Sequence, residues 1–330
     1  MSPDQQPIIG ESAAFLEILE EVSRAAVLNR PVLIVGERGT GKELIAERLH
    51  FLSTRWDQPL VKMNCAAISE TLLESELFGH EAGAFTDAAR RRQGRFELAD
   101  GGTLFLDELA TTSMNIQEKI LRVIEYGQFE RLGSSRTISV DVRVIGATNE
   151  DLPALAGKGR FRADLLDRLA FDVVTLPPLR ERREDIMPLA EHFAIRMTRE
   201  LGREIFPGFS SAARQLLLDH AWPGNIRELK NVVERAIYRH PDDDQPVGGI
   251  QFDPFDSPWR PSNKPQETIP TQPADTLPDD LRAYLDQVEK ETVLKALDAS
   301  NGNQAGAARA LGLTYNQLRG IMRKHGIKSG

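Results

Sequence analysis

Several features that mark membrane or disulfide-stabilised proteins are missing from this sequence of 330 residues. Cys65 is its only cysteine, which excludes an intramolecular disulfide and favours a reducing compartment, by default the cytoplasm. No stretch approaches the roughly 20 apolar residues that cross a bilayer, so we expect no membrane insertion. The start, MSPDQQPIIG, has neither a basic region nor an apolar core, so we expect no signal peptide.

Acidic residues are also missing from the end of a chain that is acidic overall. The net charge is -8, yet residues 301–330 carry five basic side chains and no Asp or Glu. A basic segment on an acidic body is typical of a small module that meets phosphates while the rest has another task. On charge alone, a solvated basic terminus explains the segment equally well.

Short apolar runs alternate with helical patterning over the first half of the chain. The runs suit strands that are buried on both faces, and they lie at 31–36, 60–64, 103–107, 142–149 and 171–176. The segments with helical patterning lie between these runs, near residues 41–52, 114–125 and 161–170. Strands separated by helices predict an α/β domain with a parallel sheet and ligands at the carboxyl ends of its strands.

The pattern changes after residue 176, which predicts four parts. Residues 1–176 form the α/β part, and 177–240 show helical patterning only, near 187–200, 209–219 and 225–239, which predicts a helical lid. Residues 241–278 contain nine of the 19 prolines among polar residues, so we expect a flexible linker over 241–277. Helical patterning resumes over 278–330 and predicts an all-α domain.

The segment GERGTGKE predicts a phosphate-binding loop that opens a helix. Its glycines let backbone N–H groups close around phosphate oxygens, and Lys42 adds a positive charge. Glu43 stands where Ser or Thr usually ligates magnesium, so Mg²⁺ must rely on phosphates, water and Asp107. We assign the whole loop to binding ATP: Gly36, Glu37, Arg38, Gly39, Thr40, Gly41, Lys42 and Glu43.

The segment GGTLFLDE ends a buried strand with two adjacent carboxylates, Asp107 and Glu108. Buried carboxylates without a partner are costly, which disfavours a purely structural role. Downstream of a phosphate-binding loop, we expect Asp107 to hold Mg²⁺ and Glu108 to activate water. Both are therefore candidate catalytic residues.

Between these two motifs lies ESELFGHEAGAFTDA at residues 74–88, which shows no obvious nucleotide chemistry. GAFTDA resembles the GAFTGA loop of bacterial enhancer-binding proteins, AAA+ ATPases that remodel RNA polymerase carrying sigma-54. The resemblance implies that Phe85 and Thr86 contact sigma-54. Asp87 replaces the family's glycine, and Asp tolerates positive φ, so whether it weakens or tunes the coupling stays open.

Other nucleotide-site residues follow from this resemblance to an AAA+ domain. It implies that Asn64 hydrogen-bonds the Walker B glutamate, Glu108, and switches its readiness. It also implies that Thr148 and Asn149 act as sensor I. In WPGNIREL, Arg227 matches the phosphate-sensing residue of sensor II.

Two arginines in FRADLLDRL match residues that reach the nucleotide of a neighbouring subunit in this family. They are Arg162 and Arg168, and the resemblance implies that the chain assembles with itself into a ring, a hexamer. Such an arginine can contribute about 10³–10⁵ in rate. A surface salt bridge explains either arginine alone equally well.

The last 30 residues predict a helix-turn-helix, with two short helices joined near Gly312 and the second at 315–325. Arg319 and Arg323 are four residues apart and so share one face of the second helix. The apolar seam would be Ala308, Leu311, Leu318, Ile321 and Met322. The tail resembles the Fis-type domain of enhancer-binding proteins, which implies DNA contacts by Asn316, Arg319, Arg323 and Lys324. A helical hairpin that does not bind DNA is the alternative.

The resemblance covers nearly the whole chain and points to the branch of the family that activates phage shock operons during envelope stress. It implies sigma-54 RNA polymerase and enhancer DNA as partners. The AAA+ core begins within about ten residues of the start, so we expect no receiver domain and control in trans by phage shock protein A. Trp56 is a candidate contact, although packing explains such a Trp equally often.

Two other functions stay open on the sequence alone. The first is a nucleotide-responsive DNA-binding regulator that does not remodel sigma-54 polymerase, with Asp87 as its sign. The second is an AAA+ unfoldase or helicase loader whose tail binds nucleic acid nonspecifically. Open-complex formation tests the first, and sequence-specific footprinting tests the second.

Overall fold

The computed structural model describes residues 7–84, 90–241, 244–257, 259–260, 280–300 and 303–327. The chain divides into two compact units, Met1–Pro254 and Phe255–Gly330, and each is described by itself. The predicted sigma-54 contacts Phe85 and Thr86 lie outside the described residues, as does Asp87.

A parallel sheet forms the centre of the first unit, and the order of its five strands among the described residues is β2-β3-β6-β1-β7. The strands are β1 (Val32–Val35), β2 (Leu60–Asn64), β3 (Thr103–Asp107), β6 (Arg143–Thr148) and β7 (Val173–Thr175). Val35 lies opposite Thr148, and Asn64 lies opposite Asp107. The predicted strands are confirmed, and the P-loop, Glu108 and Asn149 follow the carboxyl ends of adjacent strands.

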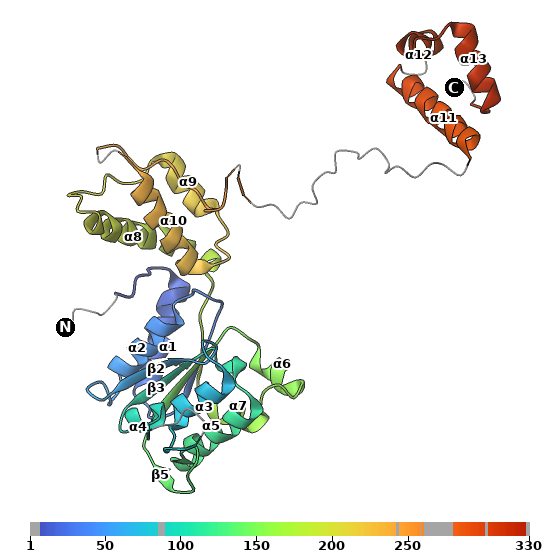
Figure 1. The fold of residues 1–330 in the computed structure, drawn as a ribbon. Coiled ribbons are helices and arrows are strands. Elements are labelled where there is room, and N and C mark those ends of the chain that lie inside the picture. Colours follow the sequence, from blue (N-terminus) through green and yellow to red (C-terminus); the bar gives the residue numbers. More distant parts are fainter. Residues whose placement is uncertain are drawn as a thin grey trace. The chain divides into compact units, whose positions relative to one another are not determined.

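Helices cover both faces of this sheet (Figure 1). On one face, α1 (Ala13–Ala26) and α2 (Lys42–Phe51) bury an apolar layer against the strands. The core on the other face is shared by α3 (Glu70–Phe78), α4 (Arg95–Leu98), α5 (Met114–Tyr126), α6 (Leu152–Gly157) and α7 (Ala163–Leu169). Burial on both faces explains why the strands read as continuous apolar runs.

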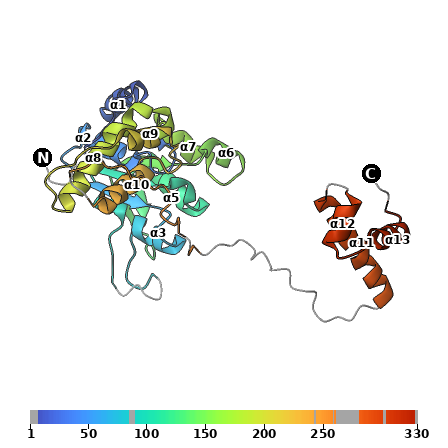
Figure 2. The same ribbon diagram turned by 90° about the horizontal axis from the view of Figure 1, so that it is seen from above.

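A short hairpin and two neighbouring arms extend this unit. The hairpin pairs β4 (Gln128–Glu130) with β5 (Thr137–Ser139), and no sequence pattern predicted it because such short strands carry too little periodicity. The arms are the chain segments that precede and follow residues 85–89, and they extend from the unit near α3 (Figure 2). His80 of one arm and Arg92 of the other exchange two backbone hydrogen bonds. Buried Arg131 follows β4 and pairs with Glu81 and Glu97 at the base of the arms.

The predicted lid is confirmed as a helical subdomain. It contains α8 (Ile186–Glu200), α9 (Ser211–Asp219) and α10 (Asn225–Arg239), reached through the 3-10 turns η2 (Leu179–Glu181) and η3 (Arg183–Asp185). The lid core surrounds fully buried Trp222. Val247, Ile250 and Phe252 pack into the same core, so residues 247–252 join the lid and are not part of the predicted linker. The proline-rich composition predicted a linker here because the apolar side chains find their partners only on the folded lid.

The second unit contains α11 (Leu281–Ala299), α12 (Gln304–Ala310) and α13 (Tyr315–Lys324). Ala308, Leu318 and Met322 are buried, with Leu311 and Ile321 packed against them, which confirms the predicted seam. Val293 and Ala296 of α11 complete this core. No helix in the described part of the chain is both long and apolar enough to cross a bilayer.

Candidate nucleotide site and DNA-binding helix

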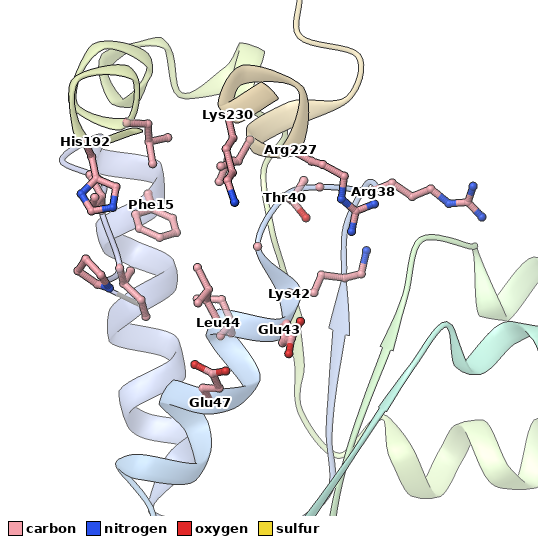
Figure 3. Close-up of a pocket in the computed structure, with 18 of the residues that line it drawn as sticks. Phe15, Arg38, Thr40, Lys42, Glu43, Leu44, Glu47, His192, Arg227 and Lys230 are labelled. Atoms are coloured by element: carbon pink, nitrogen blue, oxygen red, sulfur yellow. The ribbon is translucent and has the colours of Figure 1, made fainter. Parts of the chain in front are cut away.

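Between the sheet and the lid lies a cavity of about 750 Å³. The P-loop and the start of α2 form one wall, and Arg227 and Lys230 reach toward them from α10 of the lid (Figure 3). Phe15 and His192 line the opposite side. The volume and the mixture of cationic and aromatic groups suit a small anionic ligand with an aromatic part.

The P-loop has the backbone conformation that its glycines predict. Gly39 and Gly41 have φ values of 79° and 102°, which glycine adopts without the strain of a side chain. A Cβ atom on Gly39 would lie 2.4 Å from the carbonyl oxygen of Gly224 in the lid. Glycine at this position therefore also allows the lid to approach the loop closely.

Lys42 begins α2 and is buried beside the carboxylates. Its ammonium group donates to the carbonyl oxygens of Gly36 at 2.9 Å and Glu37 at 3.2 Å. Burial lowers the pKa of Lys42, and the charges of Asp107 and Glu108 oppose this decrease. Lys42, Asp107 and Glu108 thus line the same cavity, as the phosphate-binding loop and the GGTLFLDE segment predict.

Asp107 and Glu108 line the cavity at the end of β3. The Glu108 N–H donates to Asp107 Oδ1 at 2.9 Å, and Glu108 itself has a φ of 54°, which is uncommon for a residue with a side chain. Glu108 Oε1 lies 3.5 Å from Arg38 Nε. Two carboxylates at one edge provide the oxygen ligands that Mg²⁺ prefers.

Asn64 does not make the predicted contact with Glu108. Its Nδ2 donates to Asp107 Oδ2 at 3.5 Å, and its Oδ1 accepts from the Ala66 N–H at 2.9 Å. The reason is the strand register, because Asn64 of β2 lies directly opposite Asp107 of β3. Asn64 therefore lies at the carboxylate edge, and its switching bond to Glu108 stays a prediction.

Glu43 lines the cavity, but its carboxylate has a partner within the chain. Lys62 Nζ of β2 lies 2.9 Å from Glu43 Oε1 and also pairs with Glu47. Burial lowers the pKa of Lys62, but hydrogen bonds to Glu47 and Glu43 outweigh it and raise the pKa overall. No sequence pattern pointed to Lys62, because its position beside α2 depends on the sheet.

Of the predicted sensor I residues, Thr148 ends β6 and Asn149 follows it. The Thr148 hydroxyl accepts from the Glu150 N–H at 3.0 Å, and its carbonyl accepts from the Gly36 N–H at 3.1 Å. Asn149 Oδ1 is buried and has no hydrogen-bond partner within the described residues. An unpaired buried acceptor costs about 1–3 kcal/mol, but neither Thr148 nor Asn149 is among the residues that line the cavity.

Asn225, which the sequence did not mark as functional, fastens the lid to the P-loop. It is fully buried, and its Nδ2 donates to Glu37 Oε2 at 3.1 Å and to the Arg38 carbonyl at 3.0 Å. Arg180 also donates to Glu37, at 2.6 Å. The hydrogen bond from Arg180 and then that from Asn225 lower the pKa of Glu37 to about 2. The sequence signal that could have marked Asn225 as functional was its position directly after Gly224, at the start of a predicted helix.

A buried arginine makes a second connection between the lid and the P-loop. Arg182 Nη2 donates to the Thr40 carbonyl at 3.0 Å, and its guanidinium lies 4.7 Å from the Phe15 ring centroid. Burial lowers the pKa of Arg182, and the negative charge of Asp185 opposes this decrease. In the sequence, nothing in the segment LPPLRERREDI at residues 176–186 distinguishes Arg182 from its exposed neighbours.

Arg162 and Arg168 do not line the cavity of their own chain. Arg162 Nη2 donates to Asp164 Oδ2 at 2.7 Å and Nη1 to Glu118 at 3.3 Å, while Arg168 Nε donates to Glu125 at 2.7 Å. Arg168 is 61% exposed. Each arginine therefore has a carboxylate partner in its own chain.

On α13, the predicted DNA contacts divide into two groups. Asn316, Arg319 and Arg323 are exposed, and no ion pair engages either arginine within the part of the second unit that the structure describes. Lys324 Nζ instead lies 2.6 Å from Asp286 and 2.9 Å from Glu289 of α11. These hydrogen bonds raise the pKa of Lys324. The DNA contact by Lys324 stays a prediction, and it would require the ammonium to leave these two partners.

Three family models match the chain in sequence. They are the Sigma-54 interaction domain at residues 8–175, the AAA+ ATPase lid domain at 180–248 and the Bacterial regulatory protein, Fis family, at 284–325. The chain belongs to the sigma-54-dependent transcriptional activators. This sigma-54 activator thus has the AAA+ α/β domain, helical lid and helix-turn-helix that the sequence predicts.

Relatives of this sigma-54 activator cover nearly all of its length. It is 58% identical over 327 residues to the Psp operon transcriptional activator of Escherichia coli (strain K12), which covers 99% of this chain and 100% of the relative. It is 46% identical to the transcriptional regulatory protein ZraR of Klebsiella oxytoca, with coverage of 94% and 67%. The prediction of a sigma-54 activator is confirmed over the two alternative functions.

Among solved structures, the fold is similar to that of NtrX from Brucella abortus. The NtrX complex with ATP has a TM-score of 0.70 and 33% identity, and covers 97% of this chain and 70% of that chain. The NtrX complex with ADP gives a TM-score of 0.69 and 34% identity, with coverage of 98% and 70%.

Proposed function

We propose that this sigma-54 activator hydrolyses ATP in the cavity between sheet and lid and uses the energy to remodel the closed promoter complex. One observation carries the proposal: Lys42, Asp107 and Glu108 line the same cavity as Arg227 of the lid. Similarity to the Psp operon transcriptional activator supports a phage shock operon as the target. Because DNA and polymerase are its partners, we place the protein in the cytoplasm.

The residues around the cavity fit ATP and Mg²⁺. Bound MgATP would supply the phosphoanhydride bond whose hydrolysis provides the energy. The P-loop N–H groups and Lys42 would bind its phosphates, and Arg227 would add a cation from the lid. Asp107 would hold the ion, and Glu108 would orient the attacking water and accept its proton.

Arg162 and Arg168 support assembly into a ring, which we propose is a hexamer. Both arginines lie at the surface and outside the cavity of their own chain. In this family, arginines at these positions reach the nucleotide of the adjacent subunit. In the ring, each arginine would exchange its carboxylate partner for the phosphates of the adjacent subunit. Hydrolysis would then depend on assembly, because each site takes residues from two subunits.

Regulation and promoter choice involve two other surfaces. We propose that Asn316, Arg319 and Arg323 of α13 bind enhancer DNA, since exposed cations on a recognition helix can reach phosphates and base edges. We also propose phage shock protein A as a negative regulator. Trp56 is 63% exposed and offers it an aromatic contact.

The loop with Phe85, Thr86 and Asp87 is the proposed sigma-54 contact, and it provides the test of function. Binding of sigma-54 would be measured for the parent, Thr86→Ala and Asp87→Gly proteins with an ATP transition-state analogue. We expect the parent to bind, Thr86→Ala to lose binding with near-normal ATP hydrolysis, and Asp87→Gly to bind at least as well as the parent. A parent that hydrolyses ATP but does not bind sigma-54 would refute coupling through this loop.

A further inference from the structure

The turn before α10 has an unusual backbone. Trp222 and Asn225 have φ values of 50° and 52°, although neither is glycine. Asn tolerates this region, but a bulky residue such as Trp is strained there, at a cost of about 1–3 kcal/mol, and persists only when its surroundings over-determine it. The turn also contacts the nucleotide loop, because the Ile226 N–H donates to the Gly39 carbonyl at 3.0 Å. Support for this turn therefore matters for the P-loop.

Glu228 and His220 support the turn directly. Glu228 Oε2 accepts from the Gly224 N–H at 2.7 Å, and its Oε1 lies 3.0 Å from His220 Nε2. The His220 ring packs edge-on against Trp222, with ring centroids 4.7 Å apart. The two side chains thus hold both a backbone donor and the indole of the strained turn.

Residues 247–252, which we call the lid strap, cover this arrangement. Phe252 stacks on His220, with centroids 4.1 Å apart and an interplanar angle of 13°, and its ring lies 5.8 Å from that of Trp222. Val247 anchors the other end of the strap, since its N–H donates to Gly208 at 2.8 Å and its carbonyl accepts from Ser210 at 3.0 Å. An aromatic ring fixed at one face of His220 limits the orientations of the imidazole.

We propose that the lid strap, acting through His220 and Glu228, positions the turn that holds Asn225 against the P-loop and presents Arg227 to the nucleotide, and so sets the nucleotide affinity. The inference rests on the proposed ATP site. Phe252, His220 and Glu228 are positioning residues, because none of them lines the cavity. Loss of the strap should let the turn relax away from the P-loop, which weakens binding without removing any phosphate ligand.

The test uses the full chain with Phe252→Ala and a fluorescent ADP analogue. We expect the dissociation constant to rise about three- to tenfold, in line with the loss of one aromatic stack, while kcat at saturating ATP changes less than about twofold. Phe252→Tyr keeps the flat ring and should restore affinity. Phe255→Ala, three residues further on, is the matched control and should bind like the parent.

Glu228 supplies a second test that preserves the fold. Glu228→Gln keeps an oxygen that can accept from the Gly224 N–H and should bind nucleotide better than Glu228→Leu, which removes that acceptor. Unchanged affinity in both Phe252→Ala and Glu228→Leu would overturn the inference. A smaller fraction of binding-competent protein with an unchanged dissociation constant would also overturn it, since that result describes stability alone. Failure of the parent to bind nucleotide would refute the proposed function itself.

Discussion

The cations of the nucleotide site and those of the recognition helix are held in opposite ways. Lys42 and Arg182 are buried and donate to backbone carbonyls, whereas Arg319 and Arg323 are exposed on α13. A buried cation loses its hydration and must be compensated by fixed acceptors, so its position is set before a ligand arrives. An exposed cation keeps its water and its freedom. The first arrangement suits one anion in a defined place, and the second suits a polyanion with repeating phosphates.

The largest effect is expected at the preorganised site. Lys42→Ala removes a charge whose position is fixed by the P-loop, so nucleotide affinity should fall by about 100-fold or more. Enhancer binding by the same protein should change little, because the helix-turn-helix belongs to the other unit. Fluorescent-nucleotide titration and a DNA mobility assay would measure the two. Equal losses in both assays would show that the two sets of cations are not independent.

Arg168 tests a third arrangement, a cation that is exposed in one chain but serves a fixed site in another. Arg168→Ala alone should lose about 10³-fold or more in ATPase rate. Mixing it with Lys42→Ala subunits should restore part of the rate, because some interfaces then combine an intact pocket with an intact arginine. The control mixes Arg168→Ala with the double variant Lys42→Ala and Arg168→Ala. Equal rates in the two mixtures would contradict catalysis between subunits.

At the recognition helix we expect smaller and salt-dependent effects. Arg319→Ala or Arg323→Ala should lower the slope of log affinity against log salt by about one if the lost contact is to phosphate. If the contact is to a base, specificity should relax by about 1–3 kcal/mol. Footprinting at several salt concentrations distinguishes the two, with the ATPase rate as an unchanged control. Parent-like binding by both variants would remove α13 as the DNA contact.

The smallest effect on DNA is expected for Lys324, the neighbour of Arg323 that already pairs with Asp286 and Glu289. Lys324→Ala should leave the salt slope near that of the parent and slightly lower the unfolding midpoint of the second unit, because an exposed ion pair contributes little. The midpoint can be followed by circular dichroism. A loss of DNA affinity equal to that of Arg323→Ala would mean that Lys324 leaves its partners to bind phosphate.

Predicted and observed features of this protein agree where they depend on local sequence. The P-loop, the DE motif and the strands were predictable, because glycine spacing and apolar runs reflect local backbone requirements. The hydrogen-bond partner of Asn64 was not predictable, because it depends on which residue lies opposite Asn64 in the sheet. Lys62, Arg182 and Asn225 were missed for the same reason. Each acts on a residue that is distant in the chain.

The sequence by itself determined the family, the order of the parts and the identity of the groups that carry charge. These properties depend on residue type and on short spacings, which survive without knowledge of the fold. The tertiary structure alone decided which charges are already paired, such as Lys324 with Asp286, and which side chains lock the lid, such as Asn225 on Glu37. Ion pairs and hydrogen bonds act over a few ångströms in space, and only the folded chain brings distant residues within that range.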